Sequence, residues 1–167
     1  YRNDRLLKKY NNLLSVVNSY NESLKSLSDT QLKELYLSLK QKINGNSDLE
    51  KHLPQVYAIV REVSTRTIGM RHYDVQILGG IALFYGKITE IATGEGKTLI
   101  ATLPISLYSM LNKPIHVITV NDYLAKRDAQ WMSPVYSFLD ISVGIIIPGM
   151  SNIEKKVAYK SDVVYGT

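Results

Sequence analysis

The sequence predicts an α/β fold in which N-terminal helices precede a parallel β-sheet. Apolar residues recur at helical spacing in the first half of the chain, whereas short β-branched runs alternate with amphipathic segments in the second half. Strands and helices that alternate over short connections are typical of a parallel sheet with helices on both faces. A glycine-rich turn between a predicted strand and a predicted helix is the third observation, and it also carries the functional prediction.

Three helices are expected before residue 70. An apolar stripe predicts the first one: Leu6, Leu7, Tyr10, Leu13, Leu14 and Val17. Ser28 followed by Gln31 is a capping-box pattern and should begin the second helix, which Gly45 should end. Pro54 is expected in the first turn of the third helix, where no N–H is needed, and Gly69 should end that helix in a left-handed conformation.

From about residue 73 the pattern predicts alternating helices and strands. In order, we expect a helix at 73–83, a strand at 87–91, a helix at 97–111, a buried strand at 115–120, a helix up to about 139, a strand at 142–147, a helix at 153–159 and a strand at 162–165. The glycine pair at 79–80 should permit close packing. Either Asn121 or Asp122 should cap the long helix, in which Pro134 should cause a kink or a break and Trp131 should face the core.

Length, composition and charge exclude several classes of protein. The 167 residues suit one domain, or one domain with a helical extension, and 45% of them are hydrophobic. The lack of cysteine excludes a disulfide framework and a thiolate zinc site, and no apolar run approaches the ~20 residues that span a bilayer. Part of the net charge of +5 is concentrated near the N-terminus, which indicates a solvated helix end more than a nucleic-acid surface. Because the chain starts at Tyr1 and stops at Thr167 after a strand-like run, we expect it to be part of a longer protein.

A phosphate-binding loop is the strongest functional prediction. The residues concerned are Thr93, Gly94, Glu95, Gly96, Lys97 and Thr98. Glycines let backbone N–H groups turn inward into an anion-binding nest, and the helix that follows directs its positive dipole end at the phosphates. Lys97 is expected to neutralise phosphate charge, and the Thr98 hydroxyl is expected to coordinate Mg²⁺. The predicted ligands are therefore ATP and Mg²⁺, with Lys97 and Thr98 in the catalytic roles.

The match to a strict P-loop (Walker A) pattern is incomplete. That pattern has a glycine five positions before Gly96, where this chain has Ile91. The remaining pair, Gly94 and Gly96, is a variant that occurs in helicase-like motors. A flexible glycine turn before an amphipathic helix is the alternative, and the strand–turn–helix context makes it the less favoured one.

Residues upstream of the loop are candidates for base recognition. Met70 and Tyr73 can pack on an adenine ring, and the Gln76 amide can pair with the edge of the base because it offers both donors and an acceptor. On spacing alone, core positions for Met70 and Tyr73 and a surface amide at Gln76 are favoured.

Other polar residues carry weaker signals. His52, His72 and His116 lack metal-ligand spacing, so structural roles are favoured for them. A helix cap and a surface charge account for Asp122 and Asp128. No acidic cluster follows an apolar strand, as a Walker B motif would require.

Four groups of residues carry a family resemblance. They are residues 70–76 with 78–80, residues 86–88 with 93–99 and 101–104, residues 116–117 with 119–125 and 127–128, and residue 162 with 165–167. Together they resemble the SecA family of protein-secretion ATPases, and the run Thr119–Asp128 is the most specific because ordinary helicases lack it. The departures from the family pattern are Tyr73 in place of phenylalanine, Ile91 and Ala92 in place of methionine and lysine, and Ser133 in place of glycine.

The resemblance implies a RecA-like, two-lobed P-loop motor with ATP bound between the lobes. Residues 1–53 would be an N-terminal helical segment, and residues 54–167 would be the first part of the nucleotide-binding lobe. Gln76 becomes an expected adenine contact, with Met70 and Tyr73 near the base. The Walker B acids, the catalytic base and the arginine finger would lie beyond this chain, so the chain alone should bind nucleotide without hydrolysing it.

The resemblance also implies an activity, partners and a location. Members of this family hydrolyse ATP to drive preproteins through the SecYEG channel, and nucleic acid is not their substrate. Whether the protein forms a homodimer stays open. The basic helix at residues 5–20 resembles a segment that contacts anionic membrane surfaces, although an ordinary packed helix explains it equally well. Abundant Tyr, Lys, Asn and Ile suit an AT-rich plastid or bacterial genome. We expect the plastid stroma and peripheral thylakoid membrane if the protein is plastid-encoded, and otherwise the bacterial cytoplasm and peripheral inner membrane.

Two other functions stay open. A nucleic-acid helicase lobe of superfamily 2 would use the same P-loop chemistry, but the run at 119–128 and the lack of a strongly basic face argue against it. A non-catalytic interaction fragment is the second alternative, and nucleotide binding would distinguish it from an ATPase.

Overall fold

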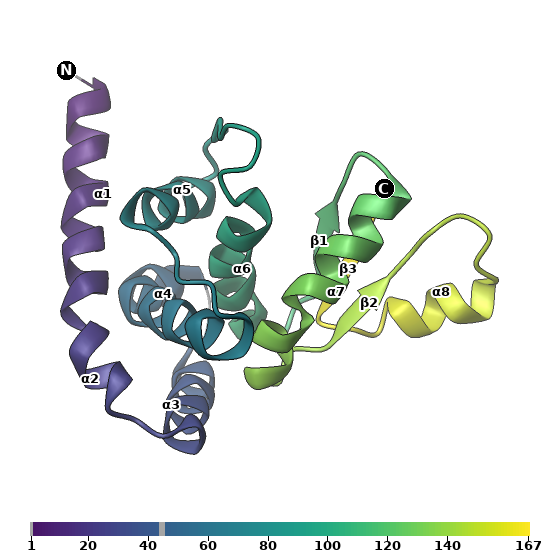
Figure 1. Cartoon of the computed structure of the whole chain (residues 1–167), viewed down its shortest axis with the longest axis horizontal. Coiled ribbons are helices and arrows are strands. Elements are labelled where there is room, and N and C mark those ends of the chain that lie inside the picture. The colour runs from purple at the N-terminus through teal and green to yellow at the C-terminus, as the bar shows by residue number, and fades with distance from the viewer. Residues whose placement is uncertain (1, 44–45) are drawn as a thin grey trace.

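The computed structural model describes residues 2–43 and 46–167, and it shows a group of helices beside a small β-sheet (Figure 1). The helices are α1 (Arg2–Ser19), α2 (Asn21–Lys25), α3 (Asp29–Lys42), α4 (Asn46–Ile68), α5 (Asp74–Phe84), α6 (Lys97–Tyr108), the 3₁₀ turn η1 (Ser109–Leu111), α7 (Asp122–Phe138) and α8 (Asn152–Ala158). The strands are β1 (Ile115–Ile118), β2 (Val143–Ile145) and β3 (Val163–Gly166). The expected order of helices followed by a parallel α/β segment is confirmed.

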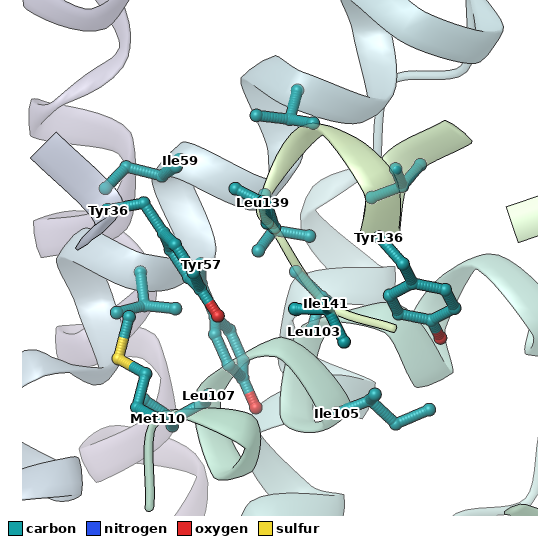
Figure 2. Packing of buried hydrophobic residues seen from close by; sticks show 14 of the residues in the cluster. Tyr36, Tyr57, Ile59, Leu103, Ile105, Leu107, Met110, Tyr136, Leu139 and Ile141 are labelled. Atoms are coloured by element: carbon teal, nitrogen blue, oxygen red, sulfur yellow. The ribbon is translucent and has the colours of Figure 1, made fainter. Parts of the chain in front are cut away.

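Helix α4 is the centre of the helical part. Helices α1, α2, α3, α6 and α7 all pack against it, and its residues from 56 to 64 are buried. Figure 2 shows Tyr36 of α3, Tyr57 of α4 and Leu103 of α6 in one cluster of buried side chains. The tyrosine hydroxyls are satisfied inside this core, because Tyr57 donates to the Gly80 carbonyl at 2.8 Å and Tyr36 donates to the Ser106 carbonyl at 2.7 Å.

The local signals for helix ends are mostly confirmed. Ser28 accepts from the Gln31 N–H at 3.2 Å, and the Gln31 side chain accepts from the Ser28 N–H at 2.9 Å. Gly69 has a φ of +68° just after α4. In α7 the cap is Asn121, whose side chain accepts from the Leu124 N–H. The break expected at Gly45 lies outside the described residues.

The expectation for Pro54 is wrong, because α4 begins at Asn46 and Pro54 lies inside the helix. Proline removes one helical hydrogen bond at this position. Leu49, Leu53 and Val56 around it are fully buried. Burial of this helix face in the core offsets the lost bond, and the helix continues.

The sheet is parallel, with the strand order β1-β3-β2. Because parallel crossovers are right-handed, the connection β1–α7–β2 and the returning connection β2–α8–β3 place α7 and α8 on opposite faces. Tyr165 of β3 shares a 2.9 Å hydrogen bond with Tyr136 on the α7 face. On the other face, a Cβ at Gly144 would overlap the Ala158 carbonyl oxygen of α8. The prediction of a sheet covered by helices on both faces is thereby confirmed for β3 and β2.

Strand β1 differs from its prediction. It ends at Ile118 instead of continuing to Val120, and it is an edge strand in which Ile118 is 70% exposed. A β-branched run alone does not distinguish a buried central strand from an edge strand, because the neighbouring elements decide the burial.

The strand expected at 87–91 is absent, since this segment has no ladder partner among residues 2–43 and 46–167. A strand needs a neighbour to pair with its backbone, and the sequence of the segment cannot supply one.

Two expectations for helix α7 are also wrong or only partly met. Trp131 was expected in the core but is 47% exposed, whereas the adjacent Met132 is fully buried. Pro134 lies inside α7 without dividing it. In the part of the chain that is described, no helix has the length and hydropathy needed to cross a bilayer.

Candidate functional site

The glycine-rich loop at residues 93–98 connects the extended segment 87–92 to helix α6. Gly94 and Gly96 have φ values of +89° and +80°, and Gly96 is the residue that caps α6. These values fall in the left-handed region that favours glycine. A Cβ at Gly96 would also lie 2.5 Å from Nε2 of Gln76, so no larger residue fits there without a shift. Open space surrounds Gly94.

The first turn of α6 presents unpaired backbone donors. The N–H groups of Lys97, Thr98 and Leu99 have no hydrogen-bond partner among the described residues, and Gly96 contributes no side-chain cap. These donors lie at the positive end of the helix dipole. The loop and this turn border a cavity of about 410 Å³, which Met70 and Trp131 also line. The arrangement fits an anion with several acceptor oxygens.

Lys97 is folded back on the loop. Its ammonium donates to the carbonyl oxygens of Ile91 at 2.7 Å and Ala92 at 2.9 Å. Both contacts are to neutral groups, so an anionic oxygen in the cavity would be a stronger partner for the same ammonium. The Lys97 side chain therefore links the start of α6 to the segment that precedes the loop, and it remains exposed to solvent.

Thr98 faces helix α7. Its hydroxyl donates to Oδ2 of Asp128 at 3.2 Å, and Oδ1 of Asp128 accepts from Arg127 at 2.8 and 2.6 Å. The sequence predicted only a surface charge at Asp128, but its side chain is 14% exposed. Leu124, Arg127 and Trp131 lie at helical spacing and line the same cavity. That spacing, placed directly after a predicted strand, is the signal that could have identified this face of α7.

Gln76 is buried at the base of the loop. Its Nε2 donates to the Glu95 carbonyl at 2.9 Å, and its Oε1 accepts from the Tyr73 N–H at 2.9 Å. The alternative of a surface amide is therefore wrong. The structure brings Met70 to the loop cavity, but the Tyr73 ring is 74% exposed and lines a separate cavity of about 730 Å³.

His72 is a buried residue that the sequence analysis did not assign to the site. Its ring contacts the Ser64 hydroxyl at 3.2 Å through Nδ1 and the Leu99 carbonyl at 2.9 Å through Nε2. Burial lowers the pKa of His72 from 6.5 to about 4, and the hydrogen bond to Leu99 only partly opposes this shift. A neutral ring with its proton on Nε2 donates to the Leu99 carbonyl. Nδ1 then accepts from the Ser64 hydroxyl, which the Arg61 carbonyl also contacts at 3.0 Å, so His72 joins α4 to the first turn of α6.

Arg61 holds the segment before α5 in place. Its guanidinium donates to the His72 carbonyl at 2.9 Å, to Asn18 of α1 at 2.6 Å and to Asp74 at 2.6 Å. The hydrogen bond from Arg61 lowers the pKa of Asp74, against a smaller effect of burial. The N-terminal helix α1 is thereby linked to the residues that lead into Gln76.

Acidic clusters do not contribute to this site. Within residues 2–43 and 46–167, no group of three or more His, Cys, Asp or Glu side chains could hold a metal ion. His116 lies on the face of β1 that meets Tyr159, with ring centroids 5.9 Å apart, and takes no part in the loop.

Comparisons with known proteins place the chain in one family. The family described as the SecA DEAD-like domain matches residues 1–167. The chain is 51% identical to the protein translocase subunit SecA of Syntrophus aciditrophicus, over 99% of the chain and 20% of that protein. It is 49% identical to the protein translocase subunit SecA of Coxiella burnetii, over 99% of the chain and 18% of that protein. The chain thus spans about a fifth of the length of the curated relatives it matches.

Proposed function

Because the chain belongs to the SecA DEAD-like domain family, we propose that it is the ATP-binding part of an ATPase that moves preproteins through the SecYEG channel. The observation that carries the proposal is the row of N–H groups on Lys97, Thr98 and Leu99 beside the Lys97 ammonium, which have no hydrogen-bond partner in the part of the chain that the structure describes. Donors of this kind at a helix N-terminus are suited to phosphate oxygens.

Each residue of the loop has a role in this proposal. The N–H groups of the first turn of α6 would hold phosphate oxygens, and Lys97 would exchange its two carbonyl contacts for them. Thr98 would be the ligand from this chain to Mg²⁺, which supplies charge neutralisation on the phosphates. Thr93, Gly94, Glu95 and Gly96 would form the backbone cradle.

Base recognition is assigned to the segment before α5. Met70 lines the loop cavity and would pack against the base. Gln76 retains one N–H and one lone pair beyond its two contacts, which is the pairing capacity that an adenine edge requires. The Tyr73 ring is exposed and would have to turn toward the base from its position at the neighbouring cavity.

The division of the chain and its partners are part of the proposal. Residues 1–53 would be a helical segment and residues 54–167 the first part of the motor lobe, with α4 running through the boundary between them. The proposed partners are preprotein, the SecYEG channel, an anionic membrane surface and a second copy of the protein. The proposed locations are the bacterial cytoplasm and inner membrane surface, or the stroma and thylakoid surface if the gene is plastid-borne.

The decisive experiment is Lys97→Ala in the full-length protein. Loss of the ammonium should abolish ATP turnover with little change in melting temperature, because Lys97 is exposed and packs in no core. Lys113→Ala is the matched control, since Lys113 is an exposed lysine beyond the other end of α6. Near-normal turnover by Lys97→Ala would contradict the proposed site.

A second experiment separates protein transport from nucleic-acid unwinding. Preprotein and membranes that contain SecYEG should stimulate ATP turnover, whereas RNA should not. The 167-residue chain by itself should bind nucleotide weakly without hydrolysing it. Stimulation by RNA alone would favour a helicase, and turnover by the isolated chain that depends on Lys97 would show that the catalytic groups are all within it.

Gln76→Ala tests the assignment of the base. The substitution should weaken ATP by about 1–3 kcal/mol and weaken GTP less, because guanine presents a carbonyl where adenine presents an amino group. Competition binding with both nucleotides measures the difference. Equal losses would mean that Gln76 only supports the loop through Glu95.

A further inference from the structure

The carboxylate of Asp128 lies between a hydroxyl and a guanidinium. Thr98, in the first turn of α6, donates to Oδ2 at 3.2 Å, and Arg127 donates twice to Oδ1. Helices α6 and α7 pack against each other, so this contact joins two neighbouring elements. Each oxygen of the carboxylate therefore has its own partner.

The direction of the hydrogen bond determines what Thr98 can offer to a ligand. A threonine hydroxyl has one proton to donate and two lone pairs. When the proton is directed at Asp128, neither lone pair is used by that contact. Thr98 also lines the loop cavity, so a cation in the cavity would meet a hydroxyl with free lone pairs.

We propose that Asp128 is a positioning residue for Thr98, which accepts the threonine proton and leaves the hydroxyl oxygen free to bind a divalent cation. The inference rests on the proposed function, since the cation is the one that accompanies the nucleotide. Arg127 contributes to this positioning because two of its N–H groups donate to Oδ1 of Asp128, which leaves Oδ2 to accept the hydrogen bond from Thr98.

The substitution Asp128→Asn is a sharp test because it keeps the shape and reverses the hydrogen bond. The amide oxygen of the variant is drawn to Arg127, so the amide nitrogen faces Thr98. Thr98 must then accept a hydrogen bond, and a lone pair that the cation needs is used. Helix α7 should keep its place in the fold of this variant, because Ala125, Ala129 and Met132 on the same helix are buried.

The measurement is ADP affinity of the full-length protein by calorimetry, in excess Mg²⁺ and in EDTA. Asp128→Asn should lower the affinity about 10–100-fold in Mg²⁺, as is typical when a residue that orients a metal ligand is removed, and should leave the affinity in EDTA unchanged. Asp140→Asn is the matched control, because Asp140 is an exposed carboxylate just beyond the other end of α7 that pairs with Lys33. It should change neither affinity.

A double substitution completes the test. Thr98→Val removes the hydroxyl and should abolish the gain in affinity from Mg²⁺, and adding Asp128→Asn should then have no further effect. Equal losses for Asp128→Asn in Mg²⁺ and in EDTA, or a further loss in the Thr98→Val background, would overturn the positioning role. Wild-type protein that binds no ADP under either condition would overturn the proposed function itself, and the inference with it.

Discussion

The helical part of the chain and its sheet differ in how completely they bury their own surfaces. Helices α3, α4 and α6 enclose a core in which buried tyrosine hydroxyls have carbonyl partners (Figure 2). In the sheet, β3 is buried along its whole length, but β1 is a partly exposed edge and segment 87–91 has no strand partner among the described residues. The glycine-rich loop lies between these two regions.

The difference follows from where backbone hydrogen bonds are made. A helix satisfies its own backbone within four residues, so a few helices can complete a core by packing their apolar faces. A strand needs a neighbour along each edge. We therefore expect the helical part to determine global stability and the sheet to respond locally to substitution.

The largest expected effect is in the helical core. Leu103→Ala should lower the free energy of unfolding by about 2–5 kcal/mol, because the side chain is fully buried and its removal leaves a cavity. Urea denaturation of the chain, followed by circular dichroism, measures it. Leu7→Ala is the control, with a side chain that is 55% exposed, and it should change stability by less than about 0.5 kcal/mol. Similar losses in the free energy of unfolding for the two variants would contradict the expectation that the helical core determines global stability.

The second effect is a pH dependence that originates in His72. The pKa of His72 is about 4 in the folded chain against an ordinary 6.5, so between these values the unfolded chain binds a proton that the folded chain does not. The free energy of unfolding should therefore fall as pH decreases from 6.5 toward 4, by up to about 1.4 kcal/mol per pH unit. Above 6.5 the contribution is complete. The pKa of Asp74 is lowered below 3.8, so Asp74 contributes to the pH dependence of the free energy of unfolding only at lower pH.

His72→Gln should remove that slope, since glutamine offers a donor and an acceptor without titrating. Urea denaturation at several pH values measures the slope in both proteins. An unchanged slope in the variant would assign the pH dependence to other groups.

A smaller effect is expected at the contact between the sheet and α8. Gly144→Ala should cost about 1–3 kcal/mol locally, because its Cβ meets the Ala158 backbone carbonyl, which cannot turn away. Gly79→Ala in α5 meets only side-chain atoms at 3.6 Å or more and should be neutral or stabilising by about 0.5–1 kcal/mol. Hydrogen exchange in α8 and in α4 distinguishes local loosening from global unfolding. Loss of protection in α4 for Gly144→Ala would show that the sheet supports the helices.

The smallest effect concerns the capping box, a motif that occurs both in the helical part and beside the sheet. Ser28 begins α3 and Ser151 begins α8, each with a complete capping box. Ser28→Ala should lower global stability by about 1 kcal/mol. Ser151→Ala should increase hydrogen exchange in α8 without changing the global value, because α8 has seven residues and is mostly exposed. Equal global losses would mean that α8 unfolds together with the helical part.

Local chemistry allowed the sequence to determine much of this fold. The capping box at Ser28 and the left-handed Gly69 follow from hydrogen bonding and sterics within a few residues. The alternation of strands and helices after residue 112 follows from periodicity, and it predicted the parallel sheet. The glycine-rich loop before α6 was located from its own residue motif at 93–98. Each of these features depends on neighbours in the chain, so the sequence alone was sufficient.

Only the tertiary structure decided which residues meet across elements. It placed Gln76 under the Glu95 carbonyl and Asp128 against Thr98, and it exposed Trp131 while burying Met132. It also left segment 87–91 without a strand partner, although the residues themselves suit a strand. The physical reason is the same in each case. Burial, strand pairing and side-chain hydrogen bonds depend on the groups that packing brings from distant parts of the chain, and no local pattern specifies those groups.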